Sequence, residues 1–348
     1  MTQLVELASG VDSLYLSGQC ELSSGLLDAL ERGRADAQEA GSPSPFSFGG
    51  YDWQLKGHAL HKYRFWLDHP IVSLGITPSE TLPPLYAQFR SEAIHSLGAS
   101  GAVQWLTTAL SNEGLPGDFT VSRVDLHADW QHWALTGDLR HRFVCRSRDL
   151  TTYEDSLDLT GFSFGNRKTG TMTARIYDKT REIEGNGHDW WYEIWGSAFD
   201  KELPVLRIEF EFARTALHEL LLASPENTLA SVDRLWAYGT QDWLTYRVPS
   251  AHSSHDRWPI APEWEQVQRA TLAGNALPME RITQGRKAGE LRRLMPGLNG
   301  YVAGFASWTD NDTIEDACAA LPEHLHQYER RSRRTFCSRV LEKRQSRR

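Results

Sequence analysis

Three short segments of the sequence share an alternating pattern in which every second residue could take part in phosphate chemistry. The alternate positions are Asp125, His127 and Asp129 in VSRVDLHADW; Arg207, Glu209 and Glu211 in LRIEFEF; and Arg175, Tyr177 and Lys179 in ARIYDK. Successive side chains of a strand point to opposite faces, so each segment would line up its polar residues on one face. The intervening residues are apolar and would face a core.

Tyr177 is a candidate nucleophile because it stands between two cations, Arg175 and Lys179. Its phenol has an ordinary pKa of about 10, and nearby positive charge favours the ionised form. Attack of this oxygen on a phosphodiester would give a covalent phosphotyrosine and a free 3′-hydroxyl. The plainer alternative is a solvated strand face that carries ordinary charges.

The carboxylates of the other two segments are candidate metal ligands. Carboxylates that gather on one surface repel one another, and a divalent cation would offset this repulsion. Oxygen ligands suit Mg²⁺ or Mn²⁺, and the imidazole of His127 would favour Mn²⁺. Such an ion could polarise a phosphodiester and stabilise the charge that develops during displacement.

The composition is that of a globular protein. The chain has 348 residues, of which 40% are hydrophobic, enough for one large domain and a smaller one or for two ordinary domains. Its four cysteines are far apart, which predicts a reducing compartment without a disulfide framework or a zinc ribbon. It has no signal-peptide pattern and no apolar run near the roughly 20 residues that span a bilayer. We therefore expect a cytoplasmic protein with no membrane partner.

Charge is unevenly distributed. The net charge is −8, yet residues 330–348 carry nine Lys or Arg and one Glu, so this tail is +8 and the rest of the chain −16. The tail fits either an arm attracted to polyanions or a solvated helix end. An acidic body can still bind DNA where its cations cluster and its carboxylates hold a metal.

Hydrophobic periodicity predicts an α+β domain over residues 1–250 and a mainly helical C-terminal region with a basic tail over 251–348. Strands are expected at 118–133 and 204–214, and a hairpin at 159–179 whose turn is GNRKTG. Helical spacing predicts one or two helices over 83–112, and small, polar residues predict a loop over 31–50.

Two further motifs carry less weight. The sequence HLH at 324–326 resembles a metal motif that requires a strand, but it lies in a segment with helical spacing, where residues i and i+2 diverge by about 200°. We therefore reject it as a metal site. The aromatic segment DWWYEIWG at 189–196 is interpreted as core or a hairpin, with a base-stacking platform as the alternative. It also contains Tyr192, a rival nucleophile without flanking cations.

The strings RVDLHAD, FGNRKTGTMTARIYDK and LRIEFEF, in this order and spacing, resemble the motifs of trans-acting rolling-circle replication initiators (Rep_trans) of small plasmids and phages, a family related to some conjugative relaxases. The resemblance is close over residues 118–215 and looser over about 50–240. The family strings are R-[IL]-D-L-A-x-D, [YF]-x-G-x-R-x-S-x-x-x-x-R-I-Y-[DN]-K and W-R-[IV]-E-[IV]-x. This chain departs from them at His127, Thr169 and Leu206, where a small residue, Ser and Trp are usual.

The resemblance implies an antiparallel-sheet nicking-endonuclease core related to the HUH-type fold. It implies metal-dependent, site-specific nicking and rejoining of single-stranded DNA through a 5′-phosphotyrosine. The implied residues are the nucleophile Tyr177 with Arg175 and Lys179; the metal ligands Asp125 and Glu209, joined by Asp129, His127 and Glu211; and the DNA contacts Arg167, Lys168 and Arg207. For His127, the roles of ligand, base and bystander all remain open.

The implied partner is the single-stranded or cruciform origin of a plasmid or phage replicon, with Mg²⁺ or Mn²⁺ as cofactor. A host helicase and a second copy of the chain are further candidate partners. Two alternatives remain open, a conjugative relaxase with the same chemistry and a non-catalytic DNA-binding regulator.

Overall fold

The computed structural model describes residues 3–167, 170–272, 298–332 and 335–345. The chain divides into two compact units, Met1–Arg281 and Ile282–Arg348. Sequence analysis places the boundary at residue 250. Helix α9 (Pro262–Gln268) lies beyond that point but belongs to the first unit, because its Trp264 and Val267 are buried in the main hydrophobic core.

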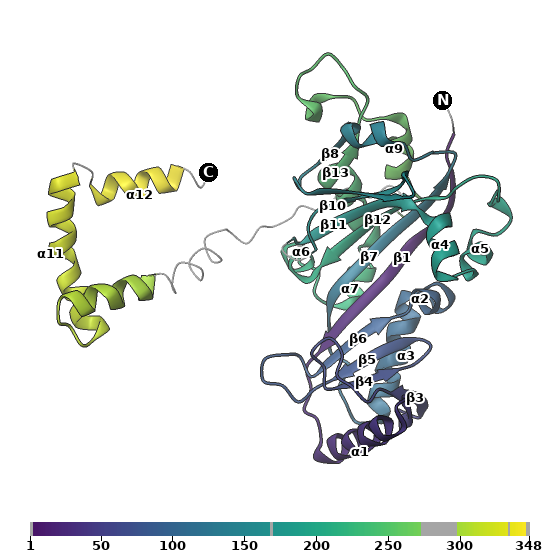
Figure 1. Ribbon diagram of the computed structural model, residues 1–348, viewed down its shortest axis with the longest axis horizontal. Coiled ribbons are helices and arrows are strands. Elements are labelled where there is room, and N and C mark those ends of the chain that lie inside the picture. Colours follow the sequence, from purple (N-terminus) through teal and green to yellow (C-terminus); the bar gives the residue numbers. More distant parts are fainter. Residues whose placement is uncertain (1–2, 168–169, 273–297, 333–334, 346–348) are drawn as a thin grey trace. The chain divides into compact units, whose positions relative to one another are not determined.

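The first unit is built on an 11-stranded sheet whose neighbouring strands all pair antiparallel (Figure 1). In spatial order the strands are β2 (Ser44–Phe48), β3 (Tyr51–Leu55), β4 (Phe65–Asp68), β5 (Val72–Ile76), β6 (Leu85–Phe89), β1 (Val5–Gly18), β7 (Phe119–Gln131), β12 (Leu206–Ala213), β11 (Met172–Asp178), β10 (Asp158–Phe164) and β9 (Leu150–Asp155). A separate pair is formed by β8 (Phe143–Cys145) and β13 (Leu244–Tyr246). The predicted α+β class with an antiparallel sheet is confirmed, as are the strands at 118–133 and 204–214 and the hairpin at 159–179.

One face of the central strands is apolar and packs against helices. Leu126 on β7 and Phe210 on β12 are fully buried. The Phe210 ring meets Trp236 edge-on, with centroids 5.4 Å apart. Burial of such large aromatic side chains is a main source of folding free energy. The helical elements that follow β12 are α6 (Arg214–Glu219), α7 (Pro225–Leu229), α8 (Val232–Ala237) and the π-helical turn η3 (Tyr238–Trp243).

The polar face of the same strands is covered at one end by α4 (Lys179–Asn186) and α5 (Trp190–Trp195). These helices form a second, small core that contains Ile183, Trp191 and Trp195. The predicted core role of the segment 189–196 therefore holds for Trp191 and Trp195, which are buried in a helix.

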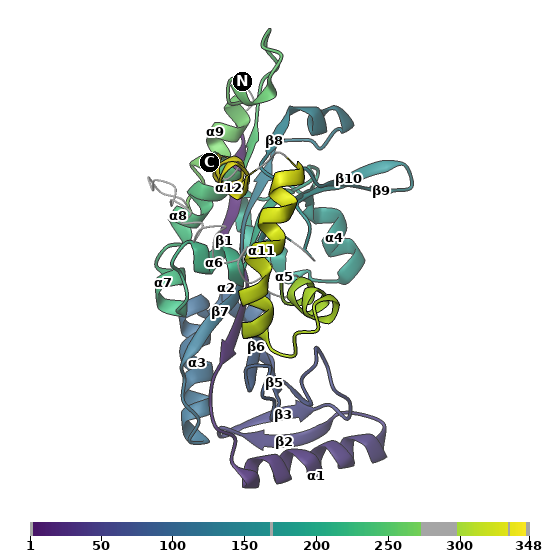
Figure 2. The same cartoon turned by 90° about the vertical axis from the view of Figure 1, so that its left-hand side faces the viewer.

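The part of the chain between β1 and β7 carries α1 (Ser24–Ala40), which lies along β2 and β3 (Figure 2). The loop predicted over 31–50 is wrong for residues 31–40, which belong to α1, and for residues 44–48, which form β2. The Ser23 side chain caps the helix start by accepting from the Leu26 backbone N–H at 3.2 Å, and Gly41 ends the helix in the left-handed conformation. The helices predicted over 83–112 are α2 (Ser91–Leu97) and α3 (Ala99–Asn112), whereas 85–89 form strand β6.

The second unit is mainly helical where it is described. It contains α11 (Ile314–Ser332) and α12 (Phe336–Gln345), and residues 298–308 are also helical. His324 and His326 lie inside α11, which confirms the helical setting of the HLH string. Short 3₁₀ turns elsewhere are η1 (Gly137–Arg142), η2 (Gly196–Ala198) and η4 (His255–Arg257). No helix within the described parts of the chain has both the length and the apolar composition needed to cross a membrane.

Candidate active site

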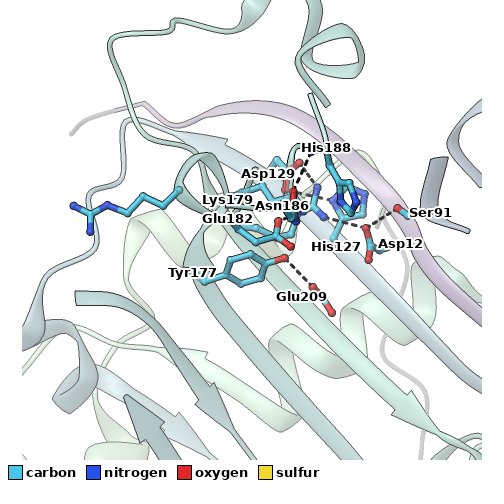
Figure 3. A network of polar contacts seen from close by, with 12 residues as sticks. Asp12, Ser91, His127, Asp129, Tyr177, Lys179, Glu182, Asn186, His188 and Glu209 are labelled. Atoms are coloured by element: carbon cyan, nitrogen blue, oxygen red, sulfur yellow. Dashed lines mark hydrogen bonds and ion pairs between the residues drawn. The ribbon is translucent and has the colours of Figure 1, made fainter. Parts of the chain in front are cut away.

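The polar residues predicted from strand alternation meet on neighbouring strands β7, β12 and β11 (Figure 3). The residues opposed across these strands are Asp129, Arg207 and Tyr177; His127, Glu209 and Arg175; and Asp125 with Glu211. Lys179 does not continue its strand, since it is the first residue of α4. Its buried ammonium group forms an ion pair with Glu182 and lies 6.0 Å from the centre of the Tyr177 ring.

Tyr177 is hydrogen-bonded to a buried carboxylate. Its hydroxyl donates to Glu209 Oε2 at 3.2 Å, and the other oxygen of Glu209 forms an ion pair with Arg175. Burial, followed by the charge of Glu209, raises the pKa of Tyr177 well above its ordinary value, and Arg207 and Arg175 offset this only in part. The cations were expected to ionise this tyrosine. In the protein alone the phenol is instead neutral, and Glu209 is positioned to accept its proton.

Arg207 is fully buried between two carboxylates. It binds Asp129 through two hydrogen bonds, Nε to Oδ1 at 2.6 Å and Nη2 to Oδ2 at 2.7 Å, and its Nη1 lies 3.0 Å from Asp12 Oδ1. Burial alone would raise the pKa of Asp129, but Arg207 and then His127 hold it far below its usual range. Arg207 is therefore not exposed for contact with DNA, and it is the internal counter-ion of Asp129 and Asp12.

The other predicted metal ligands are also paired with arginine. Arg123 Nε donates to Asp125 Oδ1 at 2.7 Å, and Glu211 Oε2 lies 3.0 Å from Arg123 and 2.8 Å from Arg167. Burial raises the pKa of Asp125 to about 7, against the opposing effect of Arg123. Arginine contacts therefore occupy the carboxylates that were expected to hold an ion, and the expected ligand set does not fit a divalent metal as it stands.

A different group of side chains has the geometry of a metal site. Within the described residues, Asp12, His95 and His127 each offer a ligand atom, and these atoms lie within 4.8 Å of one another. Burial, followed by His127, lowers the pKa of His95 to about 4, so its imidazole is neutral at physiological pH. Despite burial, Arg207 holds the pKa of Asp12 at about 2. Sequence reasoning missed Asp12 and His95, because each is a single polar residue in a segment with no motif.

A cavity of about 490 Å³ opens beside Tyr177, between β9, β10, β11 and the start of α4. Three arginines, Arg167, Arg175 and Arg181, line it together with the acidic residues Asp155, Asp178 and Glu182. Gly161 lies across the strand pair from Tyr177, and a Cβ atom at this position would come 2.9 Å from the Tyr177 Cβ. Of the predicted DNA contacts, Arg167 is among the residues that line the cavity, and Lys168 lies outside the described residues.

Comparisons with known proteins find similarity among solved structures. No protein-family model matches the chain, and no curated protein matches it significantly. Among solved structures, the chain is similar to the rolling circle replication initiator protein from Geobacillus stearothermophilus, with 12% sequence identity and a TM-score of 0.49. The match covers 80% of this chain and 99% of that one.

Proposed function

We propose that this protein is a rolling-circle replication initiator that nicks and rejoins one strand of DNA at a specific site through a phosphotyrosine on Tyr177. The observation that carries the proposal is the setting of the Tyr177 hydroxyl. It bonds to the buried Glu209, and its ring borders a cavity lined by three arginines. A nucleophile, a proton acceptor and cations for a phosphate are thus gathered at one place.

The reaction follows from these contacts. Glu209 accepts the phenolic proton while the Tyr177 oxygen attacks the phosphorus atom, and the bond from phosphorus to the 3′-oxygen breaks. The 3′-oxygen takes up a proton from water and leaves as a hydroxyl, and the 5′-phosphate stays on Tyr177. Attack by a 3′-hydroxyl on the phosphotyrosine reverses these steps. Because a phosphoester replaces a phosphoester, nicking needs no ATP.

The arginines bind and neutralise the phosphate. Arg167 and Arg181 line the cavity and would contact non-bridging phosphate oxygens. Arg175 is paired with Glu209 and would stabilise the charge that develops near the phenol oxygen. A divalent metal, Mg²⁺ or Mn²⁺, would add positive charge at the phosphodiester when bound.

The test is covalent capture. The protein is incubated with Mn²⁺ and 5′- and 3′-labelled single-stranded DNA from the origin of its own replicon, and products are separated on a denaturing gel. We expect an adduct with the 5′-phosphate fragment that is absent from Tyr177→Phe and unchanged in Tyr192→Phe. An unaltered adduct in Tyr177→Phe would refute the assignment. Binding to duplex DNA without any adduct would identify a regulator, and mapping the nick to a transfer origin would identify a relaxase.

A further inference from the structure

Three side chains from separate parts of the chain converge beside Arg207. Asp12 comes from β1, His95 from α2 and His127 from β7. One ligand atom from each lies within 4.8 Å of the other two. The two imidazole rings meet edge-on with centroids 5.3 Å apart, and Trp191 packs against both of them.

Both histidines present a buried nitrogen without a protein partner. Within the described part of the chain, the Nε2 atoms of His95 and His127 have no hydrogen bond, and the His127 side chain is fully buried. A buried polar atom that lacks a partner destabilises the fold. Two such atoms in one cluster with a carboxylate are explained together by a single cation bound among them.

The surroundings fix His127 in the orientation of a ligand. Its Nδ1 lies 3.4 Å from Asp129 Oδ1, and this contact leaves Nε2 as the ring nitrogen without a partner. Asp129 is in turn held by Arg207 and by Trp195 Nε1 at 2.8 Å. A carboxylate that orients a histidine in this way is the usual second layer of a protein metal site.

Asp12 is held in a similar way. Ser91 Oγ donates to Asp12 Oδ1 at 3.1 Å, and Arg207 Nη1 donates to the same oxygen at 3.0 Å. The remaining oxygen, Oδ2, accepts only a long hydrogen bond of 3.4 Å from Ser13 among the contacts within the described residues. This leaves Asp12 with lone pairs for an ion.

We propose that Asp12, His95 and His127 bind one divalent transition-metal ion, with water completing its coordination. Two imidazole nitrogens and one carboxylate oxygen suit Mn²⁺, Fe²⁺, Co²⁺ or Zn²⁺, whereas Mg²⁺ prefers an all-oxygen set. The site thus replaces the predicted set of strand carboxylates, which arginines already neutralise. The ion would be held by β1, α2 and β7, and its binding does not rest on the proposed function.

The experiment measures binding to the EDTA-treated full chain. Co²⁺ is titrated and followed by its visible absorption, and Mn²⁺ and Mg²⁺ are compared by calorimetry. We expect one ion per chain and an affinity for Mn²⁺ at least about 10-fold above that for Mg²⁺. His95→Gln and Asp12→Asn should each weaken binding about 10- to 100-fold or more, and Asp129→Asn about 10-fold. Asp125→Asn and Glu211→Gln are matched controls that should bind Co²⁺ as the unaltered protein does.

The proposal is overturned if Mg²⁺ binds as tightly as Mn²⁺, if His95→Gln retains full Co²⁺ affinity, or if Asp125→Asn loses it. The proposal is also overturned if the protein binds no Co²⁺ at millimolar concentration. Near-UV circular dichroism of each variant in EDTA identifies those that are folded, and only these are compared. Tyr177→Phe should bind Co²⁺ normally, so a failure of the nicking assay and a failure of the metal site are told apart.

Discussion

The Tyr177 hydroxyl donates to Glu209 Oε2 across 3.2 Å, from one strand of the sheet to the next. Burial and this carboxylate keep the phenol protonated in the protein alone. In the proposed mechanism, activation of Tyr177 therefore requires proton transfer as well as nearby cations. Glu209 then has a proposed role as proton acceptor, distinct from the metal-ligand role that the sequence motifs imply.

Glu209→Gln removes the proton acceptor while keeping the shape of the side chain. We expect the rate of adduct formation to fall by about 10²-fold or more, the usual contribution of a general base. Affinity for single-stranded DNA should stay within about twofold of the unaltered protein. Rapid-quench kinetics and fluorescence anisotropy measure the two quantities. A normal rate of adduct formation in this variant would remove Glu209 from the mechanism.

Gly161→Ala should displace Tyr177 without a direct change in its chemistry. The added Cβ would come 2.9 Å from the Tyr177 Cβ and 3.1 Å from the Ile176 carbonyl oxygen, so the strand pair must shift. Because nucleophilic attack depends on alignment, we expect nicking to slow about 10- to 100-fold. Gly185→Ala in α4, where an added Cβ meets nothing within 4 Å, is the control and should nick normally. Equal rates for the two variants would contradict the prediction.

Arg207→Ala should be strongly destabilising. It leaves the buried Asp129 and the nearby Asp12 without their shared counter-ion, a kind of loss that typically costs about 3–5 kcal/mol. Arg181→Ala breaks an exposed pair with Asp158 and should cost under about 1 kcal/mol. Urea denaturation of both variants measures the difference. Similar midpoints would show that the buried pair adds no stability.

Asp68→Asn should make the stability of the fold less dependent on pH. Burial alone would raise the pKa of Asp68, but hydrogen bonds from Ser73 at 2.5 Å and Lys56 at 3.0 Å lower it overall. A lowered pKa means that the ionised form stabilises the fold at pH values above about 4, and that this contribution is lost as the pH falls through the folded-state pKa. The variant should thus be less stable than the unaltered protein at pH 7.

The difference in stability between Asp68→Asn and the unaltered protein should narrow as the pH approaches 3. Thermal unfolding across this pH range checks the trend. A gap that stays constant with pH would mean that the charge of Asp68 adds nothing to stability.

Much of the candidate site could be predicted from sequence because strand alternation is a local property. The pattern that puts Asp129, Arg207 and Tyr177 on polar faces needs only neighbouring residues, and the structure brings these faces together. One available signal was missed. Arg123 stands two residues before Asp125 and so shares its face, which already indicates an ion pair within the strand.

Other features depended on contacts distant in sequence. Asp12 and His95 join His127 only because β1 pairs with β7 and α2 packs on β1. Neither contact leaves a pattern in a single sequence. The start of α4, in contrast, depends on a local contact. The Asp178 side chain caps the helix by accepting a hydrogen bond from the Arg181 backbone N–H at 3.1 Å. That cap takes Lys179 out of the strand in which alternation had placed it.

The pairing of β1 with β7 also defines how the chain is assembled. Gly18 faces Phe119 at the end of their ladder, so residues 19–118 form an insertion that leaves and rejoins one hairpin. Tyr177, Glu209 and the cavity arginines all lie outside this insertion, whereas His95 lies within it. An ion bound by His95 together with Asp12 and His127 would join the insertion to strands of the proposed nicking site. Because β6 of the insertion already pairs with β1, the ion would add a second link, between α2 and the strands β1 and β7.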